Sequence, residues 1–151
     1  MTNGNITINV SQGIPIVNWG KDFFKVNVPL ISDSVQGKVL YENEVGTKDN
    51  ISLSETVANF KCIEICFHNT YYNFHSSIKI YSANGKYAVL QTSHVFSKSG
   101  TVITDSRRVA ISGTSISGIS GDEEDYGYYS SYNNSITKEN RIAITKVIGY
   151  I

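Results

Sequence analysis

Residues 60–68 alternate strongly apolar residues with less apolar or polar ones at a period of two. One side of an extended chain would carry Ile63, Ile65 and Phe67, and the other side would carry Cys62, Glu64, Cys66 and His68. Side chains of a β-strand point alternately to opposite faces, whereas a helix would place apolar residues three or four positions apart. The alternation therefore predicts a strand that buries one face.

Nine further short runs show strand-like patterning, at residues 6–10, 23–28, 37–41, 50–53, 77–81, 87–95, 101–111, 114–119 and 141–148. About ten short strands at this spacing predict an all-β fold, an antiparallel β-sandwich or jelly-roll-like domain. Asn84-Gly85 predicts a type I′ hairpin, because both residues tolerate the positive φ angles that this turn requires. Helical character is limited to one turn at residues 54–59, with Ser54 as N-cap and Asn59 at its end.

Residues 1–33 differ from the rest because Gly13, Pro15, Gly20 and Pro29 interrupt the pattern. Two interpretations are open: edge strands that close the sandwich, or an arm that contacts neighbouring copies in an oligomer. We expect residues 34–151 to form the sandwich domain. A second change in composition, at residues 118–134, is rich in Gly, Ser, Tyr and acidic residues. It predicts a long loop, and such loops on β scaffolds often carry function.

Charge is low and balanced, since Asp, Glu, Lys and Arg make up 17% of the chain and the formal net charge is zero. Arg107-Arg108 is the largest basic cluster, which argues against a nucleic-acid partner. No apolar run approaches the roughly 20 residues of a spanning helix, so membrane insertion is not expected. The beginning of the sequence shows no basic segment followed by an apolar one, so we expect no secretion signal.

The two cysteines, Cys62 and Cys66, lie four positions apart on the predicted strand. That spacing is about 13 Å in an extended chain, beyond the roughly 7 Å between Cα atoms that a disulfide allows. Free thiols indicate synthesis in a reducing cytoplasm. Cys62, Cys66, His68, His75 and His94 raise a zinc hypothesis, but the two cysteines are too far apart to share an ion, and Cys66 with His68 would need two more ligands from elsewhere. We therefore expect no metal site.

The acidic run at residues 122–125 has two chemical interpretations, paired carboxylates of a glycosidase or a calcium loop. Glycosidase carboxylates flank a bond and come from separate elements, and the spacing does not match an EF-hand loop. A solvated acidic loop is the simplest interpretation. Without a nucleophile elbow, a phosphate-binding glycine loop or an H-E-x-x-H segment, the sequence predicts no enzyme, no catalytic residues and no cofactor.

Ten tyrosines are present, and two tyrosine-rich segments cover residues 69–75 and 126–132. A tyrosine ring can stack on the C–H face of a sugar at low entropic cost, while nearby Asn and Asp side chains bond its hydroxyls. The alternative is that these rings cover the edge of the core. The candidate ligand-binding residues are Tyr71, Tyr72, Asn73, Tyr128 and Tyr129.

Five segments occur in an order that resembles a known family: VLYEN at 39–43, ISLSETVANF at 51–60, IEI at 63–65, SSIKIYSANGK at 76–86 and ITKVIGY at 144–150. The family is the C-terminal receptor-binding domain of tail-fibre and minor structural proteins in phages and prophages of Gram-positive and gut bacteria. The resemblance covers about residues 37–151 and implies a β-sandwich tip, often a homotrimer, that contacts the host surface. These motifs belong to strands and turns, so they imply no binding residue.

Three functions follow as expectations. The first is a non-catalytic domain of the virion, made in the host bacterial cytoplasm, that binds a bacterial cell-surface polysaccharide and contacts other virion proteins. The second is a structural fibre or capsid decoration protein without a ligand. The third is a fragment of a glycan depolymerase.

Overall fold

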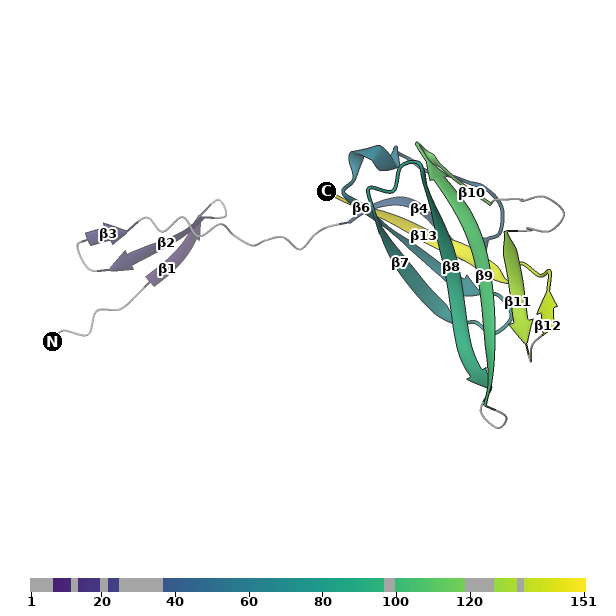
Figure 1. Cartoon of the computed structure of the whole chain (residues 1–151). Coiled ribbons are helices and arrows are strands. Elements are labelled where there is room, and N and C mark those ends of the chain that lie inside the picture. Colours follow the sequence, from purple (N-terminus) through teal and green to yellow (C-terminus); the bar gives the residue numbers. More distant parts are fainter. Residues whose placement is uncertain are drawn as a thin grey trace. The chain divides into compact units, whose positions relative to one another are not determined.

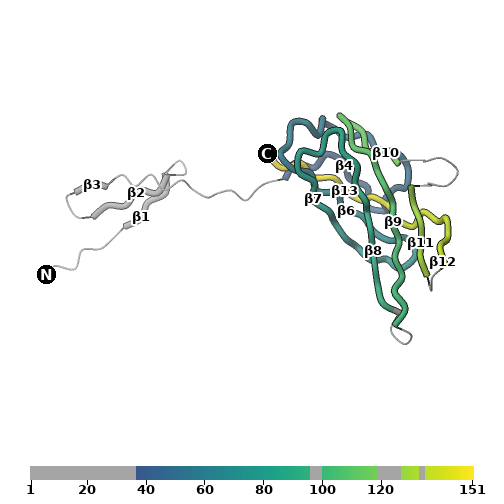
Figure 2. The backbone as a smooth tube through the Cα atoms, in the orientation of Figure 1, coloured from purple at the N-terminus to yellow at the C-terminus, as the bar shows by residue number. Residues whose placement is uncertain are grey.

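The computed structural model describes residues 7–11, 14–19, 22–24, 37–96, 100–118, 127–132 and 135–151. The chain divides into two compact units, Met1–Gln36 and Gly37–Ile151, and Figure 2 traces the backbone of the second unit in colour. Unit 1 contains a three-stranded antiparallel sheet of β1 (Thr7–Ser11), β2 (Ile14–Trp19) and β3 (Asp22–Phe24). Strand β2 includes Pro15, so this proline lies within a strand and does not interrupt one as the sequence predicts. Both interpretations of residues 1–33 stay predictions.

The described residues of unit 2 form an all-β fold of ten strands in two antiparallel sheets (Figure 1). The four-stranded sheet has the order β4 (Lys38–Thr47), β13 (Ile142–Tyr150), β6 (Cys62–Asn69) and β7 (His75–Tyr81). The six-stranded sheet contains β12 (Ser135–Thr137), β11 (Tyr128–Tyr132), β9 (Thr101–Ser112), β10 (Ser115–Gly118), β5 (Ile51–Ser52) and β8 (Lys86–Phe96). Strand β8 pairs with β9 along its full length, while β11 and β10 share the other edge of β9. The prediction of an all-β sandwich is confirmed.

The core lies between the two sheets and is almost entirely aliphatic. Strand β6 contributes Ile63 and Ile65, which are fully buried, as the period of two predicts. Leu90 of β8 and Val109 of β9 are fully buried from the opposite sheet and join the same cluster. Each such side chain contributes roughly 1.5–3 kcal/mol on burial, so the alternation in sequence translates directly into the layered architecture.

One buried arginine fixes a loop to the inner side of β9. Arg107 is 2% exposed and donates hydrogen bonds to the carbonyl oxygens of Thr47, Lys48, Asp49 and Ile142, at 2.8–3.3 Å. Burial lowers the pKa of this guanidinium, and the charge of Asp49 counters that effect. A planar group with five donors can serve several carbonyls at once, so Arg107 closes the β4–β5 connection onto the sandwich.

The Asn84-Gly85 turn joins different sheets, so the predicted hairpin is wrong. It connects β7 to β8, and these strands pair with β6 and β9 respectively. Gly85 has a φ of 75°, but Asn84 does not have the positive φ that a type I′ turn requires. The side-chain oxygen of Asn84 instead accepts a hydrogen bond from the backbone N–H of Gly113, 2.9 Å away. This turn therefore carries the chain from one layer to the other.

Two other local expectations also change. The helical turn is a 3₁₀ turn, η1 (Val57–Asn59), and its N-cap is Thr56, not Ser54. Within the predicted long loop at residues 118–134, the segment Tyr128–Tyr132 is strand β11. Its aromatic residues suit a pleated surface beside β9, and tertiary pairing prevails over the Gly- and Ser-rich composition around it. The acidic run at residues 122–125 lies outside the described residues.

Candidate ligand-binding site

The connection between β6 and β7 is held in shape by the last residue of β6. Asn69 is fully buried, and its side-chain Oδ1 accepts hydrogen bonds from the backbone N–H groups of Tyr71 at 2.9 Å and Tyr72 at 3.0 Å. Its own carbonyl oxygen accepts from the N–H of Asn73 at 2.8 Å, and its N–H donates to the carbonyl of Phe74 at 2.9 Å. Asn73 adopts a positive φ of 56°, which asparagine tolerates better than most residues. One buried amide thus determines the path of the tyrosine-bearing turn.

Beneath the turn, Asn69 connects to polar groups on the six-stranded sheet. Its Nδ2 donates to Asp105 Oδ2 at 2.6 Å and to Thr92 Oγ1 at 3.2 Å. Asp105 is fully buried on the inner side of β9, and its other oxygen lies 3.8 Å from Nη1 of Arg141. A buried carboxylate is costly unless donors and a counter-charge surround it. The network therefore fixes the turn to both sheets.

Four rings form a continuous group around this turn, which we call the aromatic cluster: Tyr71, Tyr72, Phe74 and His94. Tyr72 packs edge-on against Tyr71, with ring centroids 4.6 Å apart. His94 of β8 lies 4.2 Å from the ring of Tyr72 and 4.9 Å from that of Phe74. Tyr71 is 69% exposed and Phe74 is 44% exposed. The cluster is thus anchored from below, while two of its members face solvent.

Charged groups border the aromatic cluster at the start of β13. The guanidinium carbon of Arg141 lies 4.7 Å from the centre of the Tyr71 ring, within cation–π distance. Arg141 Nε also donates to the carboxylate of Glu139 at 2.7 Å. Burial lowers the pKa of Arg141, but Glu139 and Asp105 outweigh that effect and raise it. The guanidinium therefore carries a positive charge, which neighbouring carboxylates balance, and it is held beside an exposed ring.

The five candidate residues do not form one site. Tyr71, Tyr72 and Asn73 share the β6–β7 turn. Tyr128 lies opposite Arg107 in the ladder of β11 and β9, on the inner side, and is half-buried. Tyr129 lies opposite Ser106 on the outer side of that sheet and is 39% exposed. The structure brings together the three residues of the turn and separates the two tyrosines of β11 from each other.

Several groups of the site were not among the sequence candidates: Asn69, Phe74, His94, Asp105 and Arg141. Phe74 lies within the tyrosine-rich segment at residues 69–75 but is not one of the five predicted residues. Asp105 carried a detectable signal, because it shares a face of its strand with Ile103 and Val109, which are apolar. A charge at an inward position indicates a buried polar network. His94 and Arg141 have no comparable signal, since their role depends on which strands meet.

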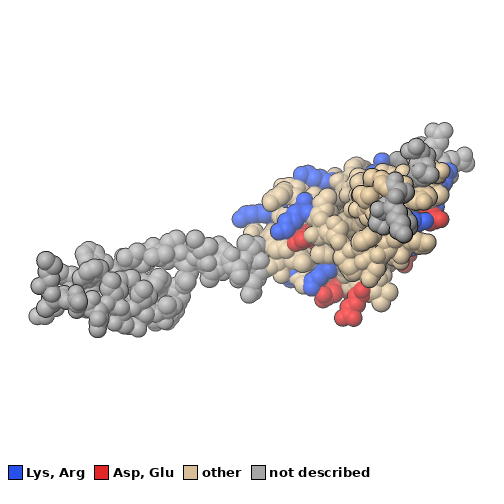
Figure 3. Space-filling view, turned by 90° about the horizontal axis from the view of Figure 1, so that it is seen from below, with Lys and Arg blue, Asp and Glu red and all other residues tan. Residues whose placement is uncertain are grey.

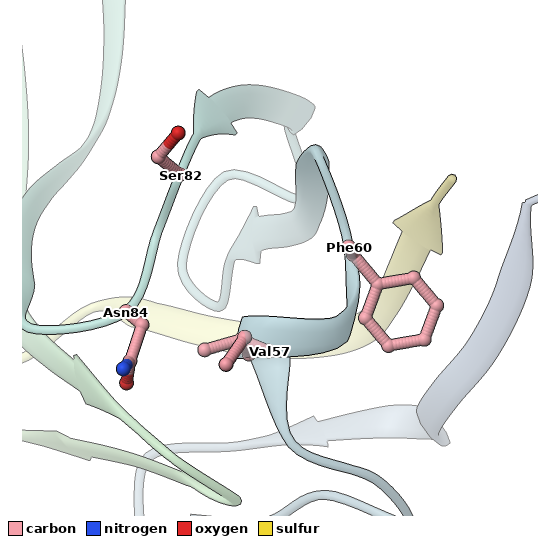
Figure 4. Close-up of a pocket in the computed structure, with 5 residues that line it drawn as sticks. Val57, Phe60, Ser82 and Asn84 are labelled. Carbon is pink, nitrogen blue, oxygen red and sulfur yellow. The ribbon is translucent and has the colours of Figure 1, made fainter.

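A pocket lies beside η1, at the end of the sandwich opposite the aromatic cluster (Figure 4). It measures about 250 Å³ and is lined by Val57, Ala58, Phe60, Ser82 and Asn84. Ligand pockets are usually about 300–1,000 Å³ with convergent polar groups. This pocket has two polar side chains at its rim, and Asn84 already accepts a hydrogen bond from Gly113. The aromatic cluster is the stronger candidate.

The residues of the zinc hypothesis are dispersed. Cys62, Cys66 and His68 lie along the outer side of β6, His75 lies opposite His68, and His94 belongs to the aromatic cluster. Both thiols are free, and burial raises the pKa of Cys66. Burial and the neighbouring His75 lower the pKa of His68. Within the described ranges, no three His, Cys, Asp or Glu side chains are placed to hold a metal ion.

No family model and no curated protein matches this chain. Among the described residues, no helix has the length and apolar character needed to cross a membrane. On the side of the molecule visible in Figure 3, basic and acidic side chains of unit 2 lie interspersed. The chemistry of the aromatic cluster is therefore the best indication of function.

Proposed function

We propose that unit 2 is a non-catalytic recognition domain that binds a saccharide at the aromatic cluster. The observation that carries this proposal is the exposure of Tyr71 and Phe74 above a buried polar network. Rings held rigid at a surface lose little entropy when a ligand stacks on them. Sugar rings offer apolar C–H faces for such stacking, and Glu139 and Asn73 provide exposed polar groups at the border.

The charge balance of the site favours a neutral saccharide. Arg141 is the one cation in direct contact with Tyr71 among the described residues, and it is paired with Glu139 and Asp105. A uronic acid or phosphate group would have to displace Glu139 from the guanidinium and approach a second carboxylate. Like charges at short range cost binding energy. Neutral hexoses or N-acetylated amino sugars fit without that penalty.

The setting proposed for this domain comes from the resemblance to phage tail-fibre tips. In that setting the ligand is a bacterial cell-surface polysaccharide, and several copies on one virion multiply a weak single-site affinity. We place the protein in the virion as a host-recognition domain that assembles with other virion proteins. A structural role without a ligand is the second candidate, and the exposed Tyr87, Val89 and Val95 on the outer side of the six-stranded sheet favour it.

The test uses the full chain, biotinylated and multimerised on streptavidin, with neutral and anionic bacterial polysaccharides and with host cells before and after their polysaccharide is removed. Tyr71→Ala and Phe74→Ala should each weaken binding to a neutral glycan about tenfold or more, since a lost stacking contact costs roughly 1–3 kcal/mol. Tyr81→Ala is the matched control, because Tyr81 is 68% exposed on β7 and Tyr71 is 69% exposed.

Three outcomes would contradict the proposal. Multimerised protein that binds no glycan and no host cell would leave the structural role in its place. A Tyr81→Ala variant that loses as much binding as Tyr71→Ala would place the contact elsewhere. Release of new reducing sugar ends from a bound polysaccharide would show a depolymerase and refute the non-catalytic assignment.

A further inference from the structure

The two outer faces of unit 2 differ sharply in chemistry. On the four-stranded sheet, the outward side carries ion pairs: Lys146 Nζ lies 2.7 Å from Glu42, and Lys79 Nζ lies 4.0 Å from Glu64. Tyr150 adds a hydrogen bond to Glu64 at 2.7 Å. Such a face is adapted to water.

The outward side of the six-stranded sheet, which we call the apolar outer face, is different. Its large exposed side chains are Tyr87 (72%), Val89 (51%), Val95 (63%), Val102 (55%), Tyr129 (39%) and Ile136 (72%). Their outward direction follows from the ladder, in which they alternate with buried Ala88, Leu90 and Ile103. Between them lie hydroxyl and amide side chains such as Ser93 and Thr104. Among the outward positions of the described strands of this six-stranded sheet, Arg108 is the one charged residue.

We infer that the apolar outer face is the surface through which copies of this chain associate. Monomeric proteins rarely expose contiguous apolar patches larger than a few hundred Å², and charged side chains are depleted and tyrosine enriched at the centre of interfaces. A charge-poor face offers little to a charged or polynucleotide partner. The same face on a second copy is equally apolar and introduces no pairing of like charges beyond Arg108, so a second copy is the occupant that fits.

The dimensions of the face are sufficient for this role. Strands β8 and β9 contain 11 and 12 residues, which corresponds to about 35 Å at roughly 3.3 Å per residue. At about 4.8 Å between strands, β8 and β9 cover about 340 Å², and the shorter β10, β11 and β12, with 4, 5 and 3 residues, add about 190 Å². The total, about 530 Å² before side-chain relief is counted, exceeds the roughly 500 Å² per partner that a specific interface needs.

This inference rests on the oligomer expected in the proposed function and names the surface that forms it. The experiment is sedimentation equilibrium of the full chain over a wide concentration range, comparing wild type with Val89→Glu/Val95→Glu. The wild type should be at least dimeric, and the double variant should dissociate with a dissociation constant raised roughly a hundredfold or more, because four glutamates would be buried in each pair. Circular dichroism and the urea midpoint should show that the variant stays folded.

Val39→Glu is the matched control, because Val39 is 42% exposed and lies on the outer side of the other sheet. It should leave the mass unchanged. A wild-type chain that is monomeric at every concentration would overturn the inference, as would an oligomer that survives Val89→Glu/Val95→Glu. An oligomer disrupted by Val39→Glu instead would assign assembly to the opposite face. Glycan binding is read on streptavidin-multimerised protein, so a failure of assembly and a failure of ligand binding are distinguishable.

Discussion

Replacing Asn69 with alanine should destabilise unit 2 far more than any surface asparagine change. The substitution removes a hydrogen bond to the buried carboxylate of Asp105 and another to Thr92. It also removes the acceptor of two backbone N–H groups in the β6–β7 turn. A hydrogen bond to a charged group contributes roughly 1.5–3 kcal/mol, and a neutral one roughly 0.5–1.5 kcal/mol. Because water can reach part of the turn, we expect a total loss of about 3–5 kcal/mol.

The assay is urea unfolding of the full chain and of each variant, followed by circular dichroism, with midpoints and slopes fitted separately. Asn59→Ala is the control, since the exposed Asn59 side chain bonds Glu55 at the surface. It should cost no more than about 0.5 kcal/mol. A double-mutant cycle with Asp105→Ala isolates the contact between Asn69 and Asp105, whose coupling energy should be about 1.5–3 kcal/mol.

The reasoning would be refuted by a cost of Asn69→Ala below about 1 kcal/mol, comparable with that of the surface control. Additive effects of Asn69→Ala and Asp105→Ala would equally refute it, because they would show that the 2.6 Å contact contributes no coupling. If Asn69→Ala lost the expected stability but left glycan binding unchanged, the turn would keep its shape without the Asn69 acceptor. That result would contradict the role of Asn69 in shaping the turn.

Three further changes test other parts of the fold by urea unfolding. Arg107→Met should cost about 3–5 kcal/mol, since it leaves four carbonyl oxygens without their donor, among them the buried one of Ile142; a loss under 1 kcal/mol would contradict this. Gly149→Ala should cost about 1–3 kcal/mol, because its Cβ would lie 2.5 Å from the ring of Phe60, and an unchanged midpoint would show that the ring moves freely. The Tyr150 hydroxyl donates to Glu64, which raises the pKa of Tyr150 to about 12 from an unfolded value near 10. The stabilising contribution of this hydrogen bond is therefore complete below about pH 10 and lost as the pH rises toward 12. The stability difference between wild type and Tyr150→Phe should shrink over that pH range. A difference that stays constant would contradict the assignment of the hydrogen bond.

The strand-rich fold was predictable because it depends on local patterns. The period of two at residues 60–68 gives the buried face of β6 directly, and most other strands lie within a few residues of the predicted runs. What local patterns do not contain is the identity of each strand's partner. Asn84-Gly85 has the composition of a hairpin turn, yet β8 pairs with β9 and not with β7. Burial of Ala83, at 1% exposure, anchors this connection in the core, and that interaction is tertiary.

The candidate site was predictable only in part for the same reason. Composition identifies the tyrosine-rich turn, because Tyr71 and Tyr72 are adjacent in sequence. The groups that hold the turn come from β8, β9 and the start of β13, far away in the chain. Asp105 could have been found, since Ile103, Val109 and Ile111 on the same face of its strand are apolar. Tyr129, by contrast, was predicted as a ligand-binding residue because of its residue type, but the pleat of β11 places it on the apolar outer face, away from the β6–β7 turn.

The two proposed surfaces are compatible because unit 2 keeps them on different sides. The aromatic cluster lies at the β6–β7 end of the sandwich, and its member His94 points inward from β8. Val95, the next residue, points outward and belongs to the apolar outer face. Association through that face would leave Tyr71 exposed on every copy. Because linked sites convert later binding steps into intramolecular ones, an assembly of this kind would hold a repeating polysaccharide more firmly than a single aromatic cluster would.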